Sequence, residues 1–377
     1  MLGINIDYDK RIYGFDLLRA FAIFCVIHGH GKHLLEGTTI ESFPWIKLPH
    51  GVDIFFVLSG FLIGYSFIAN VNKTNGKLAL KKSLNFWKRS TLRILPNYYL
   101  ILALNYLLVT ENILPGSIDK FNLGLFFTFT QNLFYPFYNF FWESWSLAVQ
   151  EWFYFLFPLL LLVLTRITNI KKAVLIISVS FIVLSICYRL SISNVEYDSF
   201  WWDVSIRKVT VSRIDSIFFG VIAAWIRYYF PEIWNKYAVH SFLAGIILFL
   251  LVSYVPHTIN SMYTNVLFLS LSAIYIMLWF PFIDRLKNIK TVFGKFISHI
   301  SVLSYAMYLF NLMIIQILDK NYPDIMAMNA SLKYLTYWGI TLAYSYLLYV
   351  IFENPISVYG NRALHTTKMM YRRVRER

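Results

Sequence analysis

Long runs of apolar side chains, separated by short polar segments, recur from one end of the chain to the other. Each run has roughly the 20 residues that an α-helix needs to cross a bilayer core about 30 Å thick. The runs fall at 12–31, 50–70, 92–110, 146–165, 173–190, 211–229, 239–256, 262–283, 296–318 and 333–352. This pattern predicts an all-α protein, a polytopic transmembrane helical bundle of about ten spans.

One further apolar stretch, 123–137, departs from this pattern. It is rich in aromatic residues, but it is shorter than the other runs and contains a proline near its end. Short apolar runs are typical of re-entrant or interfacial segments. We therefore predict a re-entrant or interfacial segment here and not an eleventh span. A span at this point would invert the topology of everything that follows.

Basic residues are distributed unevenly among the loops. Most of the 34 Lys and Arg residues lie in the N-terminal tail, in the loops after even-numbered runs and in the C-terminal tail. Cytoplasmic loops of membrane proteins carry this excess, so both termini are predicted to be cytoplasmic. We divide the chain into an integral membrane domain, 1–360, and a basic cytoplasmic tail, 361–377, that suits contact with anionic membrane lipids.

The composition agrees with lipid as the solvent. Hydrophobic residues make up 58% of the chain and charged residues only 14%, whereas soluble domains carry about 25% charged residues. The topology of the loops accounts for the net charge of +14, so nucleic acid is not an expected partner. Both cysteines, Cys25 and Cys187, lie inside apolar runs, which argues against a disulfide framework or a thiolate metal site. No metal is predicted.

The first run carries the side chains that point most directly to chemistry. Arg19 and His30 are eleven residues apart, about three full helical turns, so they share one face with Asp16 nearby. The rise between them is about 16 Å, which places a cation toward the cytoplasmic half and an imidazole toward the outer end. An imidazole titrates near neutrality, so His30 is a candidate general base for a hydroxyl group. Interfacial hydrogen bonding is the alternative, and His28 and His33 are weaker candidates.

Two carboxylates lie at the depth predicted for His30. Asp53 opens the second run, where it either meets His30 or caps its own helix. Glu151 lies in the outer half of the fourth run, where an unpaired charge is costly. It either orients His30, binds a substrate or pairs with Arg213.

Three more polar residues are candidates for substrate binding. Gln150 precedes Glu151, and Arg213 and Asp215 open the sixth run at the same outer level. A structural salt bridge is an equally good interpretation of the last two, because charges inside a membrane are usually paired.

The loop after the second run is basic, as the positive-inside rule requires. Arg89 closes this loop, and Arg93 lies beyond it at the start of the third run. The planar guanidinium group binds phosphate with two parallel hydrogen bonds. We therefore expect Arg93 to contact an anionic ligand on the cytoplasmic side.

Five motifs occur in this order over nearly the whole chain: DLLRA…H, GVDIFFVLSGFLI, W.R..LRILP, SWSLAV.EWFY and SRIDSIFFG. In this combination the chain closely resembles the acyltransferase-3 family of bacterial membrane acyltransferases. Members typically acylate carbohydrates with a group taken from cytosolic acyl-CoA. The resemblance implies the bacterial cytoplasmic (inner) membrane, an acyl-CoA donor with acetyl-CoA as the family default, and a carbohydrate or lipid-linked glycan as acceptor. It maps the family's functional Arg and His onto Arg19 and His30.

The chain departs from the family pattern at two positions. Ser90 follows Arg89 where the family usually has a second arginine, and Gln150 replaces the first of two adjacent acids. The second acid is retained as Glu151, so it is the only carboxylate available in that motif.

Together, the spacing and the resemblance predict a mechanism. Acyl-CoA places its phosphates on Arg89 and Arg93 and its arm past Arg19, while His30 removes a proton from the acceptor hydroxyl. One of the two acids described above holds the imidazole in the correct tautomer, as in hydrolytic triads. A transporter or flippase for glycolipid or acyl groups is the alternative, in which the same charges line a pathway and no bond is made.

Overall fold

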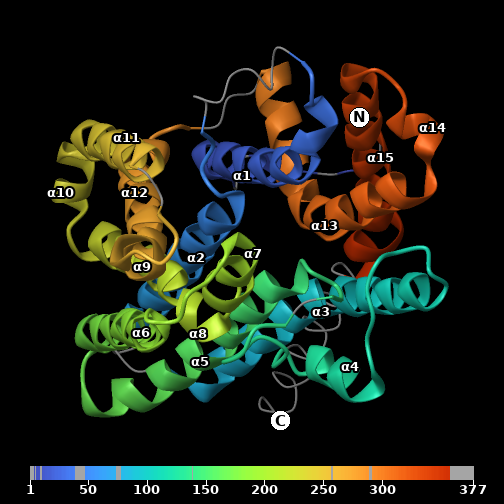
Figure 1. Ribbon diagram of the computed structural model, residues 1–377. Helices are drawn as coiled ribbons and strands as arrows, with labels where there is room; N and C mark the ends of the chain where they lie inside the picture. Colours follow the sequence, from blue (N-terminus) through green and yellow to red (C-terminus); the bar gives the residue numbers. More distant parts are fainter. Residues whose placement is uncertain are drawn as a thin grey trace, which may run out of the picture.

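The computed structural model describes residues 4, 6–8, 11–38, 47–73, 78–137, 139–255, 258–287 and 291–356. Every regular element within these ranges is a helix (Figure 1). The predicted all-α class is therefore confirmed. The predicted cytoplasmic tail, 361–377, lies outside the described residues.

Each of the ten apolar runs coincides with a long helix. These helices are α1 (Tyr13–Gly31), α2 (Gly51–Asn72), α3 (Leu80–Thr110), α5 (Ser144–Ile167), α6 (Ile170–Ile192), α9 (Asp215–Tyr229), α11 (Ala238–Tyr254), α12 (Phe268–Ile283), α13 (Val292–Asn321) and α15 (Ala330–Leu348). Short helices connect or extend them: η2 (Lys32–Leu35), α4 (Lys120–Phe127), α7 (Ser199–Trp202), η3 (Asp203–Arg207), α8 (Thr210–Arg213), α10 (Pro231–Lys236), η4 (Tyr263–Leu267), α14 (Pro323–Met326) and η5 (Tyr349–Glu353).

The described part of the chain contains seven helices that are long and apolar enough to cross a membrane. The pair Ser199–Arg207 and Thr210–Tyr229, bent by 83°, adds an eighth if it forms one span. Helix α11 has only 17 residues, and α1 interrupts its apolar surface with Asp16 and Arg19. The polytopic helical class is thus confirmed, while the count of ten spans and the orientation of the termini stay predictions.

Helix α4 occupies the short apolar stretch that follows α3. It has eight residues and is therefore about 12 Å long, less than half of a bilayer core. Turns and irregular backbone follow it at residues 128–137 and 139–143. The structure agrees with the prediction that this stretch is not a full span.

Three pairs of helices pack closely along their lengths: α1 with α13, α2 with α9, and α11 with α12 (Figure 1). The α2–α9 contact is tight because each helix places a glycine against the backbone of the other. A Cβ atom on Gly60 would meet the carbonyl oxygen of Ile217 at 1.9 Å, and one on Gly220 would meet that of Val57 at the same distance. Small residues allow this approach of two backbones in membranes.

The Gly220→Ala variant is expected to be destabilised by at least about 1–3 kcal/mol, because the added methyl group clashes with backbone rather than with a movable side chain. Thermal unfolding of the purified protein in detergent measures this. The matched control is Gly339→Ala in α15, where an added Cβ meets no atom within 4 Å. Equal melting temperatures for the two variants would contradict this account of the α2–α9 contact.

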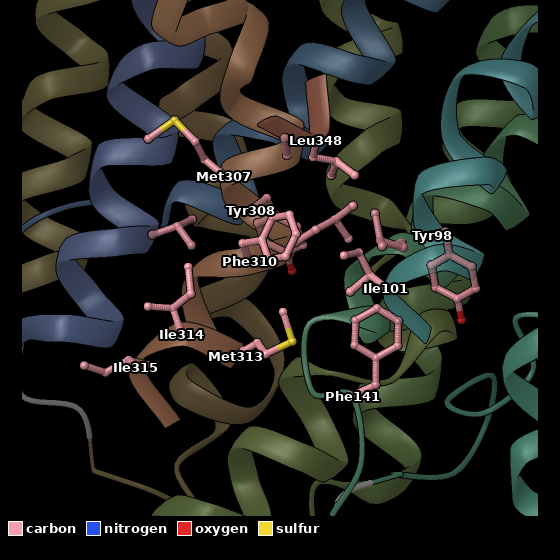
Figure 2. Close-up of a cluster of buried hydrophobic side chains, with 14 of the residues drawn as sticks. Tyr98, Ile101, Phe141, Met307, Tyr308, Phe310, Met313, Ile314, Ile315 and Leu348 are labelled. Carbon is pink, nitrogen blue, oxygen red and sulfur yellow. The ribbon is translucent and has the colours of Figure 1, made fainter. Parts of the chain in front are cut away.

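An aromatic and aliphatic core holds α13 against α3. Figure 2 shows Met307, Met313 and their neighbours on α13 with Tyr98 and Ile101 of α3. Phe141, from the segment before α5, closes the same cluster. Since α13 also packs along α1, this core fixes the helix that faces the polar side chains of α1.

Candidate active site

Three cavities lie inside the bundle. The first, here called the histidine cavity, has a volume of about 630 Å³. His28 and His30 of α1, Glu143 before α5, and Arg207 and Lys208 before α8 are among its lining residues. Polar side chains from segments far apart in the sequence therefore meet around the end of α1.

The other two cavities follow the first in a row, in which each cavity shares lining residues with the next. The connecting cavity has a volume of about 160 Å³ and shares Val52 and Tyr308 with the histidine cavity. The arginine cavity has a volume of about 540 Å³ and shares Arg19 and Arg93 with the connecting cavity. The three cavities thus form a series from one end of α1 to the other.

Helices α1 and α13 form the common wall of this series. Arg19 lines the connecting and arginine cavities, and His30 lines the histidine cavity. Their Cα atoms are separated by about 16 Å along the helix axis. On α13, Ser304 and Tyr308 each line two neighbouring cavities. The sequence spacing of Arg19 and His30 therefore corresponds to the two ends of this series of neighbouring cavities.

The imidazole of His30 is held by an amide. Its Nδ1 lies 2.5 Å from Oδ1 of Asn311 on α13. The Nδ2 of Asn311 donates to the carbonyl oxygens of Met307 and Tyr308, which fixes the amide with Oδ1 toward the ring. Because Oδ1 only accepts, Nδ1 carries the proton and Nε2 is left with a free lone pair. A neutral imidazole in this tautomer can accept a proton at Nε2.

The other two histidines of this segment have different partners. Nδ1 of His28 lies 3.0 Å from the hydroxyl of Tyr334, and Nε2 of His33 lies 3.2 Å from Oδ1 of Asp319. His28 also lines the histidine cavity, whereas His33 does not.

Asp53 was a candidate to orient His30, but the structure gives it another partner. It forms an ion pair with Arg213, and both side chains are buried. Asn311 therefore takes the place predicted for an acid beside His30. The pairing has a physical reason, because Arg213 is fully buried and needs a compensating charge.

Gln150 and Glu151 are separated by the geometry of α5. Gln150 lines the connecting cavity and donates to the hydroxyls of Ser59 and Tyr154. Glu151 lines none of the three cavities, and no described group pairs with its Oε1. The structure brings Gln150, but not Glu151, to the internal space.

Asp215 belongs to a second buried network. Its carboxylate accepts hydrogen bonds from Arg189 at 2.8 Å and from Ser270 at 2.7 Å. Neither Arg213 nor Asp215 lines any of the three cavities. The geometry favours structural ion pairs, the alternative that the sequence left open, although the partners differ because Arg213 pairs with Asp53.

The arginine cavity combines cations from several segments. Arg11, Arg19 and Arg93 line it, together with Glu353. Asp16 neutralises Arg11 through two hydrogen bonds. No ion pair occupies Arg19 or Arg93 among the described residues, so both guanidinium groups are available to an anion.

Arg89 lies apart from this cavity. It is exposed on α3, and its Nε donates to the carbonyl oxygen of Asn85 at 3.1 Å. Since Arg93 is one helical turn further along α3, the two arginines share the same surface of the helix. The predicted role of Arg89 in binding the donor stays a prediction.

Several residues that line the cavities or contact His30 were not identified from the sequence. Asn311 lies in the middle of an apolar run, where an amide gives no motif, and Tyr308 lies one turn before it. Glu143 precedes α5 and received no role from the sequence, yet it is buried in the wall of the histidine cavity. Burial raises the pKa of its carboxyl to about 8, so the group is mostly protonated at neutral pH.

No described cluster of three or more His, Cys, Asp or Glu side chains is placed to hold a metal ion.

The apolar helices and the series of internal cavities define an integral membrane protein with a polar site inside its bundle. The particular family follows from comparison with known proteins. Residues 12–353 match the family model described as an acyltransferase domain, and the chain belongs to this acyltransferase-3 family.

Curated relatives include O-acetyltransferases. A Staphylococcus aureus (strain COL) protein, named as a candidate O-acetyltransferase, is 27% identical over 95% of this chain and 59% of its own length. The O-acetyltransferase OatA of S. aureus (strain NCTC 8325) is 34% identical over 49% of this chain and 30% of its own length. The peptidoglycan O-acetyltransferase OatA of Listeria monocytogenes is 30% identical over 47% and 28%. The chain thus spans 59% or less of these relatives, and no solved structure matches it.

Proposed function

We propose that this protein is a membrane O-acyltransferase of the bacterial inner membrane, which moves an acetyl group from cytosolic acetyl-CoA to a hydroxyl group of a cell-surface or lipid-linked carbohydrate. The observation that carries the proposal is the series of three cavities, with Arg19 and Arg93 at one end and His30 at the other. The names of the relatives support acetyl as the group that is moved, and one of them names a carbohydrate polymer as the acceptor.

On the donor side, Arg19 and Arg93 bind the phosphates of the CoA moiety, with Arg89 one turn away on α3. Both cavity arginines present guanidinium groups free of ion pairs with described residues, and guanidinium–phosphate contacts are strong because they are charge-assisted. The thioester arm enters the connecting cavity, which is lined by Phe55, Phe56 and other apolar side chains together with hydroxyl groups.

On the acceptor side, His30 acts as the general base. Nε2 takes the proton of the acceptor hydroxyl as its oxygen attacks the thioester carbonyl carbon. The new carbon–oxygen bond forms, the carbon–sulfur bond breaks, and the departing thiolate receives the proton from the imidazolium of His30. Asn311 keeps Nδ1 protonated throughout, so that the base is always Nε2.

The proposal is tested with the purified protein in a zwitterionic detergent that carries no hydroxyl group. The protein is given acetyl-CoA labelled in its acetyl group and an extract of lipid-linked glycans from the host. Release of free CoA thiol with transfer of label to the glycan is expected. Glycan transport in proteoliposomes without any labelled product would instead favour the transporter interpretation.

The Arg93→Gln variant is expected to raise the KM for acetyl-CoA by at least about tenfold, since a hydrogen bond to a charged group contributes about 1.5–3 kcal/mol. Steady-state thiol release at varied acetyl-CoA concentration measures this, and kcat should change less than KM. The matched control is Arg166→Gln, at the end of α5, because Arg166 lines none of the three cavities. An unchanged KM in Arg93→Gln would remove Arg93 from the donor site.

A further inference from the structure

The histidine cavity is strongly cationic. Four of its described lining residues are Lys32, Lys47, Arg207 and Lys208, and its only described lining carboxyl belongs to Glu143. These cations come from three separate segments: η2 after α1, the residues before α2, and the η3–α8 junction. Their convergence on one cavity is therefore a property of the fold and not of one basic stretch.

Membrane topology does not account for these four residues. The positive-inside rule explains Lys and Arg in cytoplasmic loops, whereas the segments around His30 are predicted to lie on the opposite side, where basic residues are depleted. Lys32 and Lys47 form no ion pair with any described residue. Both side chains are exposed, so an anion that enters the cavity can reach their charges.

Local negative charge is insufficient to neutralise the cavity. Asp203 pairs with both Arg207 and Lys208, the latter at 2.6 Å, so one carboxylate serves two cations. Glu143 adds little at neutral pH, because burial raises the pKa of its carboxyl to about 8. The histidine cavity therefore keeps an excess of positive charge.

The two inner cations are held in fixed positions. The Nζ of Lys208 lies 4.6 Å from the ring centre of Trp142. The guanidinium carbon of Arg207 lies 5.7 Å from the ring centre of Trp145. Cation–π contacts and the shared Asp203 orient both groups before any ligand arrives. Such preorganised donors suit the oxygen atoms of a carboxylate or phosphate.

We infer that the acceptor is an anionic carbohydrate, whose carboxylate or phosphate is bound by Lys208, Arg207 and the neighbouring lysines while its hydroxyl group reaches His30. This inference deepens the proposed function and rests on it, because it assigns the same cavity to the acceptor. The charge selects the acceptor and places the reactive hydroxyl beside Nε2 of His30, whereas the donor is bound at the other end of the cavity series.

Matched acceptors test the inference directly. Oligogalacturonate and its methyl ester carry the same free hydroxyl groups but differ in charge, and N-acetylglucosamine 1-phosphate and methyl N-acetylglucosaminide form a second pair for phosphate. Binding of each compound to the purified protein is measured by calorimetry without acetyl-CoA, and transfer is measured separately by thiol release. At least one charged member is expected to bind at least about tenfold more tightly than its neutral partner, and the preference should weaken as salt is added.

The Lys208→Gln variant is expected to lose most of this preference, with an unchanged KM for acetyl-CoA. Lys208→Arg should restore the preference because it restores the charge. Lys236→Gln serves as the matched control, because Lys236 lies on α10 and lines none of the three cavities. Melting temperatures of all variants exclude misfolding as the cause.

Three results would overturn the inference. These are equal binding of the charged and neutral partners in both pairs, no binding of any of the four compounds, and a raised KM for acetyl-CoA in Lys208→Gln, which would assign the cations to the donor. Charge-dependent binding with no His30-dependent transfer to any acceptor would instead reject the proposed function and leave the binding site intact.

Discussion

The His30→Gln variant is expected to lower the kcat of acyl transfer by about 10²- to 10⁴-fold, the usual contribution of a general base. Glutamine can still form a hydrogen bond with Asn311, but its amide cannot take a proton at neutral pH. Binding of the donor should persist, because Arg19 and Arg93 lie at the other end of the cavity series. Thiol release at saturating acetyl-CoA measures kcat, and the KM for acetyl-CoA should stay close to that of the wild type.

His33 provides the control for this variant. It lies three residues after His30, lines none of the three cavities and pairs with Asp319 on the surface. His33→Gln should therefore retain nearly full activity. If His30→Gln transferred acetyl groups at the wild-type rate, the base would have to be sought elsewhere in the cavity, first at His28.

The Asp53→Ala variant is expected to lose about 3–5 kcal/mol of stability, because it leaves the fully buried Arg213 without a compensating charge. Denaturant unfolding in detergent and the yield of monodisperse protein measure the loss. The double variant Asp53→Ala/Arg213→Met should recover most of it, since removal of both charges also removes the desolvation cost.

A surface aspartate separates this effect from a general loss of negative charge. Asp324 is exposed on α14, and Asp324→Ala should change the free energy of unfolding by less than about 0.5 kcal/mol. An Asp53→Ala protein that was as stable as the wild type but inactive would return Asp53 to the catalytic role that the sequence allowed.

Most of the architecture could be predicted from the sequence, because long hydrophobic runs are the direct signature of helices that lie in lipid. All ten apolar runs form helices. These include α11, although its 17 residues are fewer than a full span usually needs. The bend of 83° before α9 was not predicted, because Lys208 and Val209, which interrupt the helix there, include neither glycine nor proline.

The site was predicted in part for a similar reason. Helical periodicity along α1 is local, so it could relate Arg19 to His30, and both line the internal cavities. Partners across the bundle depend on tertiary packing, so Asn311 beside His30 and Arg213 beside Asp53 could not be read from spacing. Arg207 and Lys208, before α8, could not be assigned to the site from the sequence, since nothing in it shows that their side chains line a cavity.

The small connecting cavity has a consequence for the cell as well as for the reaction. A series of polar cavities through a membrane would dissipate the proton gradient if it were wide and wet, and each elementary charge that crosses gives up about 2.3 kcal/mol per 100 mV. The connecting cavity, of about 160 Å³, has room for only about five water molecules at about 30 Å³ each, and Phe55 and Phe56 are among its lining residues. Under the proposed mechanism the acyl arm displaces this water, so the enzyme with its donor bound holds the least water between its two larger cavities.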